Sequence, residues 1–151
     1  MKRFVISSLI GVFLALPAYS QDRPLAAASQ SYVPRLGDIM GATQLRHIKL
    51  WYAGKEKNWP LAEYELGQIK ESFQDAMTYY PGLPAANMTT MAKPASQIGN
   101  AIRTKNSTIF GRAFGELTAA CNACHQAQGY GHIAIRVPTG SPFTDQTFSP
   151  K

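Results

Sequence analysis

The sequence predicts an all-α protein, a four-helix bundle with an extended C-terminal tail. Between about residues 35 and 128, apolar side chains recur at three-and-four spacing, which is typical of amphipathic helices. Gly54 and the pair Pro81-Gly82 end the first two of these patterns. Four amphipathic helices with no strand before the tail favour packing as a bundle.

Each helix has its own start and stop. We expect the first over residues 35–53, ended by Gly54, and the second from Pro60 to Tyr80. A short third helix over residues 94–105 follows an irregular crossover, and the fourth begins with Ser107 as its cap. The expected inward positions are Leu36, Met40, His47 and Trp51, then Ala62, Leu66, Ile69, Phe73, Met77 and Tyr80, then Ile98 and Ile102, and finally Phe110, Phe114, Leu117, Cys121 and Cys124.

The N-terminus has the pattern of a secretory signal peptide, residues 1–20. Lys2 and Arg3 precede a mostly apolar run over residues 4–16, and Ala18-Tyr19-Ser20 places small residues at a cleavage site. The run is shorter than the roughly 20 residues that span a bilayer. We therefore expect export without stable membrane insertion, to a compartment that in a bacterium is the periplasm.

The rest of the chain divides into three segments. Residues 21–34 are rich in Ala, Ser and Pro and are expected to form a linker or arm, residues 35–128 form the bundle, and residues 129–151 form the irregular tail. The tail includes His132-Ile133-Ala134-Ile135-Arg136-Val137, a candidate extended segment. We expect the tail to wrap the surface of the bundle.

Charge argues against nucleic-acid binding. The chain has 15 basic and 9 acidic residues, and removal of Lys2 and Arg3 with the signal leaves 13 against 9, about +4. The basic residues are scattered and form no dense run. A diffuse positive surface of this kind suits docking to an acidic protein partner.

The chemistry of the chain is concentrated in Cys121-Asn122-Ala123-Cys124-His125, which has the form C-x-x-C-H. This is the attachment sequence for c-type haem. Residues three and four apart share one face of a helix, so both sulfurs reach the haem vinyl groups while the imidazole of His125 is directed at the iron. We expect one covalent haem c, bound through Cys121 and Cys124, with His125 as the proximal iron ligand.

Three other interpretations of the cysteine pair are weighed against haem. A plain disulfide leaves His125 unexplained. A thioredoxin-like pair is expected at a helix N-terminus, whereas Cys121 and Cys124 lie near the C-terminal end of a helix. A structural zinc site needs four ligands, and His47 and His132 have no paired spacing with the motif.

Residues 110–125, FGRAFGELTAACNACH, resemble the last helix of the cytochrome c-prime family and its low-spin four-helix relatives. The resemblance implies a periplasmic haem protein that carries electrons or binds a small gas, with Arg35 near a haem propionate. Members often dimerise through their first two helices, so a homodimer is one option. The chain departs from the family at Gly129, where a basic residue is usual, and in its tail, which has no counterpart there.

The sixth iron ligand decides between the two functions. No methionine follows His125, and the upstream candidates are Met40, Met77, Met88 and Met91, with His47 and His132 as imidazole alternatives. In an up-and-down bundle the end of the fourth helix lies beside the start of the first, which favours Met40. His47 lies about 10 Å further along the same helix and would replace Met40 if that helix slid by two turns.

These patterns lead to a functional hypothesis. We expect a monohaem cytochrome that carries single electrons between redox partners and is not itself an enzyme. The alternative is a five-coordinate protein that binds nitric oxide or carbon monoxide, with Met40 off the iron. A haem-free thiol oxidoreductase is the third hypothesis, from a different class.

Overall fold

The computed structural model describes residues 32–84 and 89–151, and it confirms the all-α four-helix bundle. The helices are α1 (Leu36–Lys55), α2 (Trp59–Tyr79), α4 (Ala92–Arg103) and α5 (Ser107–Ala127). The predicted signal peptide, most of the predicted arm and Met88 lie outside the described residues. Among the described helices, none is both long enough and apolar enough to cross a membrane.

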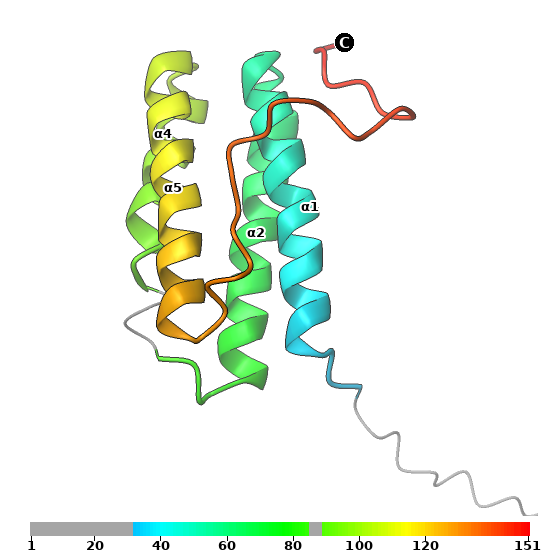
Figure 1. Ribbon diagram of the computed structural model, residues 1–151. Coiled ribbons are helices and arrows are strands. Elements are labelled where there is room, and N and C mark those ends of the chain that lie inside the picture. Colours follow the sequence, from blue (N-terminus) through cyan, green and yellow to red (C-terminus); the bar gives the residue numbers. More distant parts are fainter. Residues whose placement is uncertain (1–31, 85–88) are drawn as a thin grey trace, which may run out of the picture. The chain divides into compact units, whose positions relative to one another are not determined.

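The helices form two antiparallel pairs, as Figure 1 shows. α1 packs mainly on α2 and α4 mainly on α5, and the pairs meet less extensively along α2 with α4 and α1 with α5. α1 and α5 run in opposite directions, so the end of α5 that carries Cys124 lies at the same end of the bundle as the start of α1. This arrangement agrees with the expected topology.

The turn between α1 and α2 and the turn between α4 and α5 contain the same dipeptide, Lys-Asn. Lys57 and Lys105 have positive φ values of 58° and 51°, and Asn58 and Asn106 follow them as N-caps. The backbone N–H of Asn58 donates to the carbonyl of Ala53, and that of Asn106 donates to the carbonyl of Ala101. Each of these hydrogen bonds spans six residues and ends the preceding helix. The structure therefore corrects two expectations, because α1 runs through Gly54 to Lys55 and the cap of α5 is Asn106 rather than Ser107.

Gly54 has a packing role instead of ending a helix. It is buried in the last turn of α1, and a Cβ atom at this position would overlap the ring of Phe110, which is itself 2% exposed. The absence of a side chain thus lets α5 approach α1 at this end of the bundle.

The core follows most of the predicted stripes. The largest fully buried side chains are Phe110, Phe114, Leu50, Ile69, Ile98, Leu117 and Glu65. Glu65 is compensated by Arg46, whose Nη1 lies 3.1 Å from Glu65 Oε2. Met77 is 36% exposed, so its predicted inward position is wrong, and the adjacent Ala76 is buried instead.

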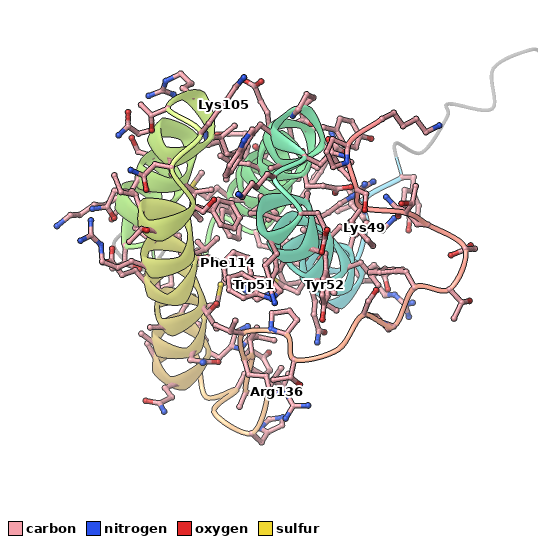
Figure 2. All side chains as sticks on the ribbon, turned by 90° about the horizontal axis from the view of Figure 1, so that it is seen from above. Lys49, Trp51, Tyr52, Lys105, Phe114 and Arg136 are labelled. Carbon is pink, nitrogen blue, oxygen red and sulfur yellow. The ribbon has the colours of Figure 1, made fainter. Side chains whose placement is uncertain are left out.

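The tail beyond α5 runs back along the bundle toward the end where α1 finishes (Figure 1). Asn122 binds it near its start, and Phe148, which is 7% exposed, packs on Tyr52 near its end, with ring centroids 5.7 Å apart. Lys49 lies over the ring of Phe143 at 5.0 Å, on the side of α1 that faces the tail in Figure 2. The tail is thus attached to the bundle at both ends.

Gly54→Ala and Gly67→Ala form a matched pair of helix substitutions. We expect Gly54→Ala to lower the free energy of unfolding by about 1–3 kcal/mol, because the new Cβ overlaps Phe110. Gly67→Ala, where a Cβ meets nothing within 4 Å, should raise it by about 0.5–1 kcal/mol through helix propensity. Urea unfolding followed by circular dichroism measures both, and equal effects would contradict the packing role of Gly54.

Candidate functional site

A cavity of about 400 Å³ opens between α1, α2, α5 and the first residues of the tail. It lies at the end of the bundle that carries the C-x-x-C-H motif. Its lining residues are Leu36, Gly37, Met40, Gly41, Thr43, Gln44, His47, Ile69, Phe73, Leu83, Met91, Leu117, Cys121, Cys124, His125, Gln128, Tyr130, Ile133 and Ile135. None of these is Asp, Glu, Lys or Arg, so the described wall is largely apolar and carries no fixed charge.

The cavity brings together the predicted residues Cys121, Cys124, His125 and Met40. The imidazole of His125 is held by the tail, since its Nδ1 lies 2.7 Å from the backbone oxygen of Ile133. A carbonyl oxygen only accepts hydrogen bonds, so Nδ1 must carry the hydrogen. In the neutral ring this leaves the lone pair on Nε2, which is the arrangement that a metal-ligating histidine needs.

His47 occupies the inner part of the same cavity wall and has a different environment. Thr118 donates its hydroxyl hydrogen to the carbonyl of Phe114 at 2.9 Å and therefore accepts from His47 Nε2, also at 2.9 Å. His47 Nδ1 is buried without a hydrogen-bond partner among the described residues. Burial of the ring, which is 4% exposed, lowers the pKa of His47 to about 4, so it is neutral at pH 7.

The contact between His47 and Thr118 fixes the register of α1 against α5. Met40 precedes His47 by seven residues and His125 follows Thr118 by seven, a displacement of about 10 Å along each helix. Because the helices are antiparallel, both displacements lead toward the same end of the bundle. Met40 and His125 therefore stand at about the same level of the cavity, whereas His47 lies about two turns away from that level.

The other candidate ligands differ in whether they line the cavity. Met91, immediately before α4, lines the cavity and is 4% exposed. Met77 is partly exposed and, like His132, is not among the lining residues. Met88 lies outside the described residues. Of the candidate ligands other than Met40, Met91 and His47 therefore line the cavity.

The cysteines are poorly suited to thiol chemistry in this environment. Both are free, and burial, with a smaller contribution from Cys124, raises the pKa of Cys121 to about 11. Burial also raises the pKa of Cys124. Their position in the last two turns of α5, at the negative end of the helix dipole, further disfavours the thiolate. The thiol oxidoreductase hypothesis therefore finds no support in this geometry.

The described residues place no additional zinc ligands beside the C-x-x-C-H motif. In residues 32–84 and 89–151, no group of three or more His, Cys, Asp or Glu side chains is arranged to hold a metal ion. His47 is hydrogen-bonded to Thr118, and His132 packs edge-on against Tyr130 with ring centroids 6.3 Å apart.

Sequence reasoning did not assign the tail to the site. Tyr130, Ile133 and Ile135 line the cavity, and Val137 packs against the core. The signal for this role was the alternation of apolar residues at positions 133, 135 and 137, which places them on one side of an extended segment. Arg35, by contrast, lies outside the cavity lining, and its Nε pairs with Asp38 Oδ2 at 2.9 Å.

Aromatic side chains close the bundle next to the cavity. Phe114 is fully buried, with ring centroids 4.4 Å from His47 and 4.9 Å from Trp51. Figure 2 shows Phe114 and Trp51 directed toward each other from α5 and α1. This packing separates the cavity from the far end of the bundle.

Comparisons with known proteins identify no relative. No protein-family model matches the chain, and neither the curated proteins nor the solved structures yield a significant match.

The buried His47 predicts a specific acid sensitivity. In the unfolded chain a histidine has a pKa near 6.5, so below this pH the unfolded state binds a proton that the folded state excludes until about pH 4. The free energy of unfolding should therefore fall as pH decreases from 6.5 to 4, by about 3 kcal/mol in total from this group.

Urea titrations of the wild type and His47→Gln at several pH values isolate this contribution, because all other titrating groups are common to both. Glutamine retains an N–H donor for Thr118 but does not titrate. The difference in stability between the two proteins should change with pH across this window. A difference that stays constant would contradict the neutral, buried state of His47.

Proposed function

We propose that the chain is an exported monohaem c-type cytochrome that carries single electrons. The observation that carries the proposal is the convergence of Cys121, Cys124 and His125 on one apolar cavity, with the Nδ1 of His125 bonded to a carbonyl. The cavity volume of about 400 Å³ lies in the range of sites for small molecules and cofactors. The thiols, the free imidazole lone pair and the apolar walls fit a covalently bound haem.

The haem would supply an iron centre that gains and loses one electron. The chain supplies its surroundings: thiols for covalent attachment, His125 Nε2 as a ligand on one side, and Met40 at the corresponding level on α1. Apolar walls without charged side chains would change little when the charge of the iron changes. This reduces the reorganisation that accompanies electron transfer and favours the less charged, reduced state.

The periplasm as location and an acidic redox partner remain part of this proposal. They rest on the predicted signal peptide and on the excess of basic residues. We propose no catalytic role for any residue. The residues that line the cavity come from one chain, so the proposed site does not require a homodimer.

The gas-binding alternative is favoured by one observation. Gly37 and Gly41 line the cavity on either side of Met40, and a Cβ atom at either position would meet nothing within 4 Å. The α1 wall therefore leaves space around Met40. If the thioether does not bind the iron, this space would admit a diatomic ligand.

Removal of the cysteines tests the mode of attachment. We expect Cys121→Ser combined with Cys124→Ser to abolish covalent haem, so that acidified organic solvent extracts all haem from the protein. The wild type, expressed with a haem-attachment system, should retain its haem under the same conditions. A wild-type protein that is colourless under these conditions would refute the proposal.

Absorption of the ferrous protein with and without carbon monoxide tests the sixth ligand. We expect a low-spin wild type that is indifferent to carbon monoxide, and a Met40→Ala variant that is high-spin and binds it. Met91→Ala is the matched control, because Met91 lines the same cavity from another element and should leave the spectrum unchanged. A wild type that already binds carbon monoxide readily would favour the gas-binding alternative, and binding only by Met91→Ala would transfer the ligand role to Met91.

A further inference from the structure

The side chain of Asn122, one of the two residues between the cysteines, binds the tail. Its Nδ2 donates to the backbone oxygen of Ile135 at 2.8 Å, and its Oδ1 accepts from the backbone N–H of Ile135 at 2.7 Å. An amide side chain carries an NH2 donor group and an acceptor oxygen side by side. It can therefore bond both the N–H and the carbonyl of one backbone residue, as a residue on a neighbouring antiparallel strand does. This is a two-point attachment between residues 13 positions apart.

The same stretch of tail contacts His125. A turn follows α5, in which Gly129 has a φ of 80° and the N–H of Tyr130 donates to the carbonyl of His125 at 2.7 Å. This turn brings the carbonyl of Ile133 to 2.7 Å from His125 Nδ1. Ile133 and Ile135 are separated by one residue of the tail, and their carbonyls bond to side chains three residues apart on α5, His125 and Asn122. Holding Ile135 therefore also sets the position of the Ile133 carbonyl.

We propose that Asn122 is a positioning residue for the proximal imidazole. By holding the tail, Asn122 keeps the Ile133 carbonyl on the Nδ1–H of His125, and this carbonyl fixes the orientation and tautomer of the ring. The inference deepens the proposed function, since the effect on iron requires haem on His125. The tail then has two roles at the site: it forms one wall, and it supplies the only hydrogen-bond acceptor that the described residues place on His125 Nδ1.

The bond has a predictable electronic effect. A hydrogen bond from Nδ1–H to a carbonyl makes the imidazole a stronger electron donor at Nε2. A stronger donor stabilises the ferric state and lowers the reduction potential. Loss of the bond should therefore raise the reduction potential and weaken the bond between iron and His125.

Two substitutions of Asn122 separate its two hydrogen bonds. Asn122→Ala removes both, whereas Asn122→Asp keeps an acceptor for the Ile135 N–H and loses the donor to its carbonyl. Asn100→Ala is the matched control, since Asn100 is an exposed amide on α4 outside the cavity lining. Circular dichroism of each variant should show the helix content of the wild type.

Release of the tail is measured first. Arg136 follows Ile135 and is the only tryptic site between residue 129 and the C-terminal Lys151. We expect Asn122→Ala to increase the rate of tryptic cleavage after Arg136 by roughly tenfold, as the loss of two hydrogen bonds implies, and Asn122→Asp by less. Asn100→Ala should cleave at the wild-type rate.

The state of the imidazole is measured second, on the haem-loaded protein. The reduction potential should be more positive in Asn122→Ala than in the wild type. Asn122→Asp is left out of this comparison, because a new carboxylate near the iron would itself stabilise the ferric state. The stretching frequency of the iron–histidine bond, recorded by resonance Raman spectroscopy in the ferrous protein with Met40→Ala as background, should fall in the order wild type, Asn122→Asp, Asn122→Ala. A merely structural role of Asn122 would not move these two quantities together.

The outcomes are distinguishable. Unchanged cleavage at Arg136 would show that Asn122 does not hold the tail, and faster cleavage with an unchanged potential and stretching frequency would show that the tail does not act on the imidazole. Either result overturns the inference. A wild type without covalent haem would instead overturn the proposed function, and the cleavage assay on that protein would still decide whether Asn122 holds the tail.

Discussion

The packing of Phe114 between α5 and α1 is the interaction on which the rest of the site depends. With Phe110 stacked beside it at a centroid distance of 6.1 Å, it closes one end of the bundle with aromatic rings. A closed end allows the helices to separate at the other end without loss of the fold, because the core stability is concentrated away from the opening. The cavity is therefore a consequence of uneven packing along the bundle axis. A uniformly packed bundle of the same length would have no such cavity.

His47 lies between the aromatic cluster and the cavity, since it contacts Phe114 and also lines the cavity. Its hydrogen bond to Thr118 satisfies one ring nitrogen in a position where an unpaired polar group is costly, and the pairing is possible at one register of α1 against α5. Apolar side chains alone would tolerate a slide of one helix along the other more readily. A buried polar pair of this kind thus sets the levels of Met40 and His125 along the bundle, although each lies seven residues away from the pair.

Local patterns predicted the helices and the grouping of Cys121, Cys124 and His125, whereas features that depend on distant contacts were predicted poorly. The C-x-x-C-H spacing is contained in five residues, and apolar periodicity is a property of each helix alone. Gly54 was predicted to end a helix because glycine usually does so, and its contact with Phe110 of another helix is invisible in the sequence. The pairing of Asn122 with Ile135 was missed for the same reason, since no periodic pattern marks an amide that binds a distant backbone.

The tail is attached to the bundle near its two ends, with a more exposed segment between the attachments. Between Ile135 and Phe148 most tail side chains are at least partly exposed, and the described contacts that hold this segment are few. Segments with little buried apolar area open at a free energy well below that of global unfolding. The segment between the two attachments can therefore open while the helices stay formed. Local opening of the tail and resistance of the bundle to denaturation therefore depend on different residues.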